Sequence, residues 1–273
     1  MTISELRKNV KNHLSGKLLK AMFMYALFVI FSIILVIIAL IGGSYFTVAN
    51  SQPLAIIAIV ILVTLLTFIL EYSMTVSMLK LYRNEPVGFF SFLSKENLKG
   101  KLAIKLNLYL IWKLLLPYIA YIGGLSLLIA GIVLSSSSSL PLSLIGILLT
   151  LVGIVLIILK TFLYVLIVPV RHDNPEATTK EVFEISASYM KGKRFKYFLL
   201  QLSYTLILII ASIVAGFALG IAQIPEDVTA LVSNIISFGG AILLYPFTSF
   251  ALFTYYDYTS NKNEVSDVTT VQE

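Results

Sequence analysis

The chain has 273 residues, of which 58% are hydrophobic and 12% charged, and its formal net charge is +6. Soluble domains contain about 45–50% apolar and about 25% charged residues, so this composition excludes an ordinary soluble protein and predicts a polytopic membrane protein. The sequence has no cysteine, which excludes disulfides, lipid-modified cysteines and thiolate metal sites.

The dipeptide Gly-Lys occurs three times, each time after a partly amphipathic stretch and before a long apolar run. Its glycines are Gly16, Gly100 and Gly192, so successive copies lie 84 and 92 residues apart. This spacing predicts three tandem units of about ninety residues, each an interfacial helix followed by two membrane spans. The expected units cover roughly residues 1–85, 86–174 and 175–258.

The first unit opens with a predicted surface helix. Its apolar residues recur at helical spacing, at Ile3, Leu6, Val10 and Leu14. The apolar run that follows is about twenty-four residues long, past the ~7–15 residues of a signal-peptide core, and no clear small-residue cleavage site follows it. We therefore expect the first span to remain in the protein.

Six apolar stretches are long enough to cross a hydrocarbon core of about 30 Å at 1.5 Å per residue. They lie near residues 19–42, 54–79, 107–133, 142–169, 197–222 and 229–255. Each must be helical, because backbone polar groups cannot stay unpaired in lipid and the sequence lacks the alternating pattern of a barrel. The predicted fold is an all-α bundle of six transmembrane helices in three parallel repeats, forming one transmembrane domain over residues 1–258. Residues 259–273 form a polar tail that we expect to be disordered.

Prolines and glycines inside the spans bear on their packing. Pro117 and Pro246 are expected to kink the third and sixth spans. Gly216 and Gly220 form a Gly-x-x-x-Gly motif, which permits close approach of helices. We expect this motif to pack within the chain rather than to form a dimer.

Lysine and arginine are distributed asymmetrically between the loops. They gather before the first span and in the second and fourth loops, whereas residues 43–52, 135–141 and 223–230 contain none. The positive-inside rule then places both termini in the cytoplasm. The expected partner of this face is a bilayer with anionic head groups. The cations are spread over three loops without a recognition motif, which argues against nucleic acid as a partner.

The third unit predicts its surface helix in most detail. Asn174 can cap a helix that has Pro175 in its first turn. Thr178 and Glu181 offer an alternative capping box, and Gly192 suits the stop. A polar stripe is predicted at Glu181, Glu184, Ser188 and Lys191. The apolar residues of the second unit, at 89–93, are clustered rather than periodic. Such helices either dock a partner or anchor the span that follows.

Three ionisable residues fall inside the spans, where a charge costs about 2.5–3.5 kcal/mol on insertion scales. They are Glu71, Lys113 and Lys160. Aligning Pro86 with Pro175 places Glu71 and Lys160 at equivalent positions of successive units. An ion pair or triad that lines a cavity or faces a ligand is one interpretation. The other is that the lysines snorkel toward the interface and Glu71 is a packing residue.

One segment, from His172 to Tyr204, carries a run of motifs. They are Asp173-Asn174-Pro175, then residues 181–186, then Met190-Lys191-Gly192, and residues 200–203. This segment resembles the signature of the bacterial domain-of-unknown-function family 975, and the run from Glu5 to Lys20 resembles the opening of that family. The resemblance implies a multi-pass protein of the bacterial cytoplasmic membrane with no assigned activity.

Three functional classes remain. An enzyme is the least supported, because the chain has no His-Glu-x-x-His, no Gly-x-Ser-x-Gly and no phosphate loop. We therefore predict no catalytic, cofactor-binding or metal-binding residue and no cofactor. A small-solute or peptide transporter with its site among Glu71, Lys113 and Lys160 is the alternative. The favoured prediction is a non-catalytic accessory, assembly or membrane-protection component, which can have a membrane-protein partner.

Overall fold

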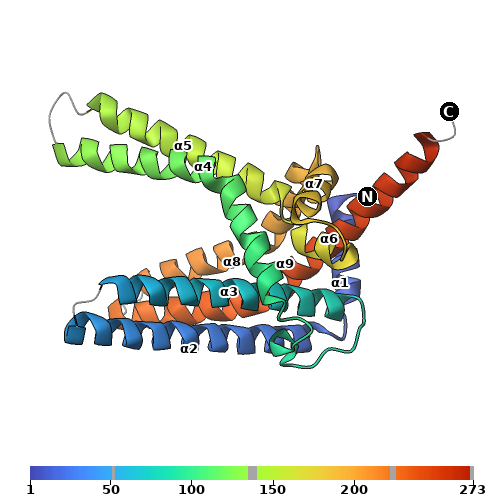
Figure 1. The fold of residues 1–273 in the computed structure, drawn as a ribbon, viewed down its shortest axis with the longest axis horizontal. Helices are drawn as coiled ribbons and strands as arrows, with labels where there is room; N and C mark the ends of the chain where they lie inside the picture. Colours follow the sequence, from blue (N-terminus) through green and yellow to red (C-terminus); the bar gives the residue numbers. More distant parts are fainter. Residues whose placement is uncertain (51–52, 135–139, 222–225, 271–273) are drawn as a thin grey trace. The chain divides into compact units, whose positions relative to one another are not determined.

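The computed structural model describes the backbone of residues 1–50, 53–134, 140–221 and 226–270. Every regular element in these ranges is helical (Figure 1). Six segments are long and apolar enough to cross a membrane, so the chain is a multi-pass membrane protein. They are Leu18–Ser44, Ile56–Tyr82, Gly100–Val133, Pro141–Asp173, Arg194–Ala218 and Val232–Ser260. The prediction of six spans is confirmed.

The chain divides into two compact units. Unit 1 comprises residues 1–104 and 195–273, and unit 2 comprises residues 105–194. Unit 1 contains α1 (Ile3–Leu14), α2 (Leu18–Asn50), α3 (Pro53–Tyr82), the 3₁₀ turn η1 (Ser91–Leu93), α8 (Arg194–Ile221) and α9 (Glu226–Thr270). Unit 2 contains most of α4 (Gly100–Leu134), α5 (Leu140–Leu163), α6 (Ile167–Asp173) and α7 (Thr179–Met190). The division follows packing rather than the predicted repeats, because α9 packs against α1, α2 and α3.

The core of unit 1 lies at one end of its spans. Fully buried side chains come from α1, from the last turns of α3 and from the middle of α9, and include Leu6, Met74, Met78, Phe250 and Phe253. The other halves of α2 and α3 expose large apolar side chains such as Ile38 and Leu62. In a membrane protein, such a surface faces lipid tails, which are as apolar as leucine.

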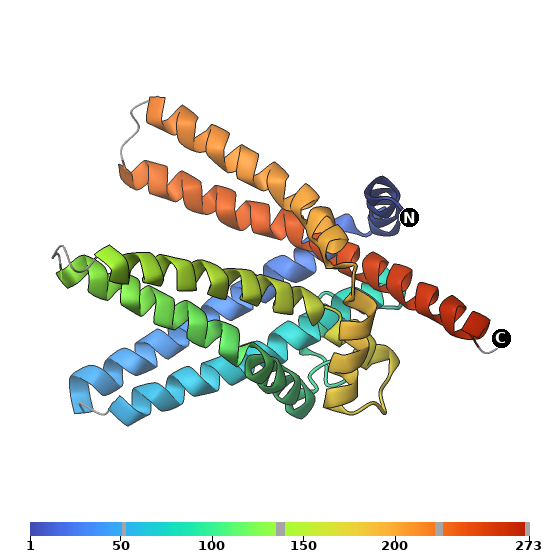
Figure 2. The same ribbon diagram turned by 90° about the horizontal axis from the view of Figure 1, so that it is seen from above.

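Unit 2 is built on an antiparallel hairpin of α4 and α5 (Figures 1 and 2). Four glycines hold the two helices close together, because a Cβ added at any of them would come within 3.0 Å of the facing backbone. They are Gly124 and Gly131 of α4 and Gly146 and Gly153 of α5. Each pair is spaced by seven residues, so both of its members face the partner helix. By contrast, a Cβ at Gly216 would meet nothing within 4 Å, so Gly216 packs closely against none of the described residues. The surroundings of Gly220 lie outside the described residues.

The fourth span differs from the uninterrupted run predicted at 142–169. α5 ends at Leu163, and α6 begins at Ile167 after a turn. The break places Pro169 in the first turn of α6, where its missing N–H does not interrupt a helical hydrogen bond. The hydroxyl of Ser186 on α7 donates to the carbonyl of Leu163, 3.1 Å away, and so partners one of the carbonyls at the end of α5.

α9 continues beyond Thr259, where the expected polar tail begins, and ends at Thr270. The disorder of that tail stays a prediction. Thr259 is buried in unit 1, and its hydroxyl donates to the carbonyl of Tyr256. The neighbouring Tyr255 and Tyr256 are buried as well, so α9 packs within unit 1 as far as Thr259.

Candidate functional site

α1 and α7 are short surface helices that begin in the same way. The hydroxyl of Thr2 accepts a bond from the N–H of Glu5 at 3.2 Å, and the Glu5 carboxylate accepts one from the N–H of Thr2 at 2.6 Å. Thr178 and Glu181 repeat this reciprocal pair at 3.3 and 2.6 Å. These bonds, led by the backbone N–H of each threonine, lower the pKa of both glutamates. The predicted capping box at Thr178 is therefore confirmed.

The other predicted cap, at Asn174, is wrong. Asn174 ends α6, and its side-chain amide donates to the carbonyl of Val170 at 3.0 Å. Thr178 starts α7 instead, because it can exchange two hydrogen bonds with Glu181 whereas a cap at Asn174 would supply one.

α1 and α7 also end in the same way. Gly16 has φ +74° and Gly192 has φ +71°, a left-handed conformation that glycine adopts without strain. Gly100 instead begins α4, and the only regular element at 89–93 is η1. Phe92 in that turn is buried, and its carbonyl accepts a bond from the Ser73 hydroxyl at 2.5 Å. The predicted second repeat, residues 86–174, therefore has only a short turn with a buried phenylalanine in the place that α1 and α7 hold in the other two predicted repeats.

The faces of α7 agree with the predicted stripe. Its polar residues Glu181, Glu184, Ser188 and Lys191 are exposed. Val182, Phe183 and Met190 are buried within unit 2, to which α7 belongs. The ring of Phe183 lies between Tyr109, at 4.7 Å between centroids, and Tyr164, at 5.1 Å. The space under α7 is thus filled by aromatic side chains.

The turn between α1 and α2 is tied to the core of unit 1. The ammonium of Lys17 donates to the carbonyl of Tyr82 at 3.0 Å, and the Tyr82 hydroxyl donates to the Asp257 carboxylate at 2.7 Å. The ring of His13 stacks on Tyr82 with centroids 4.5 Å apart. Partial burial lowers the pKa of Lys17. These contacts fix α1 against the end of α3 and the middle of α9.

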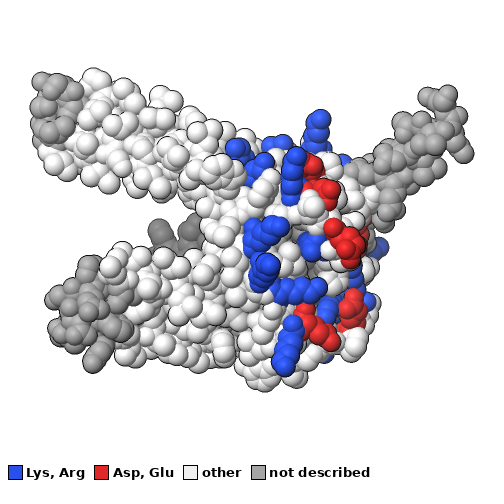
Figure 3. Space-filling model, in the orientation of Figure 1, with Lys and Arg blue, Asp and Glu red and all other residues white. Residues whose placement is uncertain are grey.

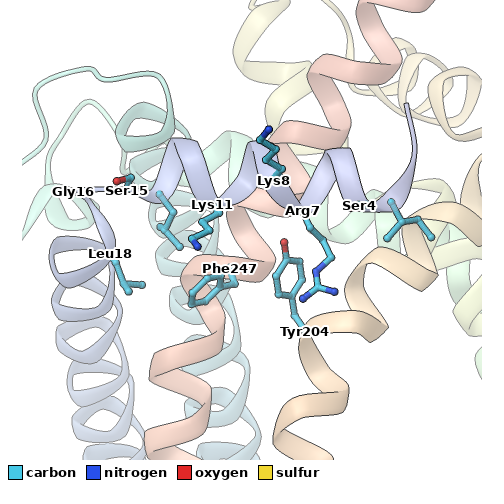
Figure 4. Close-up of a pocket in the computed structure, with 11 residues that line it drawn as sticks. Ser4, Arg7, Lys8, Lys11, Ser15, Gly16, Leu18, Tyr204 and Phe247 are labelled. Carbon is cyan, nitrogen blue, oxygen red and sulfur yellow. The ribbon is translucent and has the colours of Figure 1, made fainter.

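A pocket of about 860 Å³ lies beneath α1 (Figure 4). α1 forms its roof, Tyr204 of α8 and Phe247 of α9 line it from below, and Leu18 of α2 lines one side. Every lining residue belongs to unit 1. Three bulky apolar or aromatic side chains therefore face the underside of a surface helix.

Three cations of α1 line the same pocket, namely Arg7, Lys8 and Lys11. The guanidinium of Arg7 lies 5.8 Å from the ring centroid of Tyr204. Figure 4 shows Arg7 and Lys11 directed down toward Tyr204 and Phe247, whereas the ammonium of Lys8 points up and away from these rings. None of the described lining residues is acidic. The pocket thus combines an apolar floor with unneutralised positive charge.

Glu71 lies in unit 1, on α3, and its side chain is exposed. Tyr25 of α2 and Tyr245 of α9 lie near it in the same unit. The rings of these tyrosines stack with centroids 3.7 Å apart. Within the described part of unit 1, no Lys or Arg forms an ion pair with Glu71. A carboxylate beside two phenols can hold a proton or a cation.

Lys113 and Lys160 lie in unit 2, and the structure brings them together. The ammonium of Lys160 donates to the backbone carbonyl of Lys113 at 3.3 Å. In a regular helix this carbonyl would accept from the residue four positions on, which is Pro117 and has no N–H. Lys160 therefore supplies the donor that Pro117 lacks. The ammonium of Lys113 lies 5.3 Å from the ring centroid of Tyr109.

The intramembrane residues thus separate into two environments. Lys160 partners a backbone carbonyl, which supports a structural role for that lysine. Glu71 belongs to the other unit, so its pairing with Lys160 or Lys113 stays a prediction. Across the described residues, no group of three or more His, Asp or Glu side chains could hold a metal ion.

The pocket was missed by sequence reasoning, which treated Arg7 and Lys11 only as signals of topology. Their spacing of four residues places them on one face of α1 and was the available signal. The residues opposite them, Tyr204 and Phe247, come from helices about two hundred residues further along the chain, and no local pattern indicates that they meet α1.

Comparison with known proteins matches the chain to a protein family. A family model described as "Protein of unknown function (DUF975)" matches residues 1–263, which include both surface helices and all six spans. No curated protein and no solved structure matches the chain.

Proposed function

We propose that this chain, which belongs to the DUF975 family of proteins of unknown function, is a non-catalytic component of the bacterial cytoplasmic membrane. Its role is of the accessory, assembly or membrane-protection kind. It acts through its surface helices at the cytoplasmic face rather than through a reaction centre.

The observation that carries this proposal is the likeness of α1 and α7. Both have twelve residues, a Thr–Glu capping box and a left-handed glycine followed by lysine. Equivalent residues lie 176 positions apart, as in Thr2 and Thr178 or Gly16 and Gly192. Two copies of one surface element, each joined directly to a membrane span, support the proposed parallel repeats. They suit contact with lipid head groups or with a partner at that level.

The proposed orientation rests on charge. In each unit taken by itself, the charged side chains visible in Figure 3 lie at one end of the spans. The loops predicted on the opposite side contain no lysine or arginine. By the positive-inside rule, the charged ends and both termini are cytoplasmic.

Single-cysteine variants test this arrangement, because the natural chain has no cysteine. Ser44→Cys should react with an impermeant thiol reagent added to intact cells. Ser15→Cys and Ser188→Cys, next to and within the surface helices, should react only in inverted membrane vesicles. Ser94→Cys is a matched control from the loop after α3 and should behave like them. Labelling of Ser188→Cys from outside intact cells would overturn the orientation and the role built on it.

Transport is a second candidate, and the environment of Glu71 favours it. An exposed carboxylate within a span, beside the stacked pair Tyr25 and Tyr245, is expensive to keep in lipid and is typical of proton or cation pathways. Proteoliposomes with an internal pH-sensitive dye distinguish the two candidates. The non-catalytic role predicts the same slow decay of an imposed proton gradient with the natural chain and with Glu71→Gln. Faster decay that Glu71→Gln abolishes would favour transport.

A further inference from the structure

The pocket beneath α1 has the size and lining of a ligand site. Small-molecule sites measure about 300–1,000 Å³ and are mostly apolar, with a few polar groups that fix the ligand. At about 860 Å³, the pocket has room for the head group of a lipid and the first part of the acyl chains. Its lining is apolar at Leu14, Leu18 and Phe247, while its cationic groups all come from α1.

Among the described residues that line this pocket, none is an anion that could neutralise its cations. Glu5, the acidic residue of α1, faces its own capping threonine, so its carboxylate is occupied. Lys17, the next cation along the chain, is bound to the Tyr82 carbonyl. Arg7 and Lys11 instead point into the pocket beside aromatic rings (Figure 4). Positive charges held at an apolar surface attract a counter-anion that is itself partly apolar.

We infer that the pocket beneath α1 binds the head group of an anionic phospholipid. The phosphate contacts Arg7, whose planar guanidinium suits two oxygens of one phosphate, and Lys11 as a point charge. The chains lie along Leu18 and Phe247. Basic pockets among membrane helices on the cytoplasmic side recognise such lipids by the same chemistry. This inference rests on the proposed function, because it takes α1 to lie at the cytoplasmic face.

The test measures thermal unfolding of the full chain, purified in a neutral detergent, during titration with defined lipids. Phosphatidylglycerol should raise the Tm in a saturable way, because a ligand that binds only the folded state stabilises it. Phosphatidylcholine, which has no net charge, should not. Glycerol 3-phosphate reports on the phosphate alone and should give a much smaller rise. An equal rise with glycerol 3-phosphate would indicate a free-phosphate site and overturn the lipid inference, as would an equal rise with phosphatidylcholine.

Paired variants locate the binding. Arg7→Gln with Lys11→Gln should weaken the apparent affinity for phosphatidylglycerol roughly tenfold or more, because each cation near an anionic lipid contributes about one kcal/mol. Lys95→Gln with Lys99→Gln removes the same charge from exposed residues of unit 1 outside the pocket and should leave the affinity unchanged. Equal losses in both pairs would show non-specific charge attraction and contradict the site.

A charge-conserving pair keeps the test decisive if the glutamine pair unfolds. Arg7→Lys with Lys11→Arg retains both cations and should retain saturable binding. One molar salt should then weaken that binding, since the exposed ends of both side chains are screened. Absence of any lipid-dependent shift in the natural chain would end the inference. The thiol-labelling result is independent of detergent and lipid, so a failure of the pocket and a failure of the proposed orientation are separate outcomes.

Discussion

α1 and α7 have the same length and the same structure at both ends, but they differ in the side chains of one face. Their caps, lengths and glycine stops match position by position. Their inward faces match as well, since Leu6 and Leu14 of α1 and their equivalents Val182 and Met190 of α7 are all buried. α1 in unit 1 and α7 in unit 2 therefore share their length, end structures and buried face.

The difference lies on the neighbouring stripe. Arg7 and Lys11 of α1 correspond to Phe183 and Ala187 of α7. Phe183 fills the space under α7 between two tyrosines, whereas Arg7 and Lys11 line a space that stays open. Two substitutions on a common scaffold thus separate a packed anchor from a charged pocket. Two helices of similar outline thus differ in what fills the space beneath them.

The largest effect expected from this comparison is on stability. Phe183→Ala removes a buried aromatic side chain and should lower the free energy of unfolding by about 3–5 kcal/mol. Arg7→Ala, at the equivalent position, should change it by no more than about 0.5 kcal/mol. Chemical or thermal unfolding in detergent measures both. Similar losses for the two variants would mean that α1 is packed as tightly as α7.

The partner of Lys160 offers a second test. The ammonium of Lys160 in unit 2 is bound to a backbone carbonyl, whereas the cations of Arg7 and Lys11 in unit 1 face a pocket. Lys160→Met leaves the Lys113 carbonyl without a donor and should cost about 1–3 kcal/mol. In a Pro117→Ala background, residue 117 supplies the helical N–H, so the same substitution should cost clearly less. Equal costs in the two backgrounds would show that Lys160 does not act through this carbonyl.

The glycines that end α1 and α7 should contribute equally to the free energy of unfolding, and by less than the residues above. Gly16→Ala and Gly192→Ala introduce a Cβ at φ near +70°, with open space around both positions. Each should cost about 1–2 kcal/mol of unfolding free energy, because the cost arises from the backbone alone. Gly43→Ala serves as a control, since its surroundings are also open and its φ is not positive. A cost at only one of the two stops would break the likeness of the two helices.

The smallest expected effect is the titration of the two capping glutamates. Hydrogen bonds from Thr2 and Thr178 hold the pKa of Glu5 and Glu181 below the ordinary value of 4.5. The stabilisation is therefore present above pH 4.5 and is lost as the pH falls through the lower folded-state pKa. Carboxyl carbon NMR should show both groups titrating below 4.5. Thr2→Ala and Thr178→Ala keep the leading N–H donor, so each pKa should rise only slightly. A group that titrates at its ordinary pKa would not be capped.

Local chemistry predicted much of this molecule. The six spans follow from hydrophobic runs, and the capping box of α7 follows from Thr178 and Glu181 alone. The break before α6 could have been predicted from Pro169, whose ring is best placed in a first turn. These features depend on residues within a few positions of one another.

Features that depend on distant segments were not predictable. The Gly-x-x-x-Gly motif at Gly216 predicted close packing within the chain. The glycines that pack closely are instead those of the α4–α5 hairpin, such as Gly124 and Gly146. The burial of Thr259 depends on how α9 packs within unit 1, and the pocket depends on which helices pass beneath α1. Sequence spacing gives a face to each residue but does not say what lies opposite it.

The most direct measurement gives α1 the side chains that α7 has at two equivalent positions. Arg7→Phe with Lys11→Ala gives α1 the stripe of α7, and phosphatidylglycerol titration of its Tm in neutral detergent reads the result. If the pocket is a lipid site defined by these two residues, the variant should fold, with a Tm in lipid-free detergent at least equal to that of the natural chain. It should also lose the saturable shift with phosphatidylglycerol. A variant that folds and keeps the full shift would contradict the assignment of the site to the pocket beneath α1.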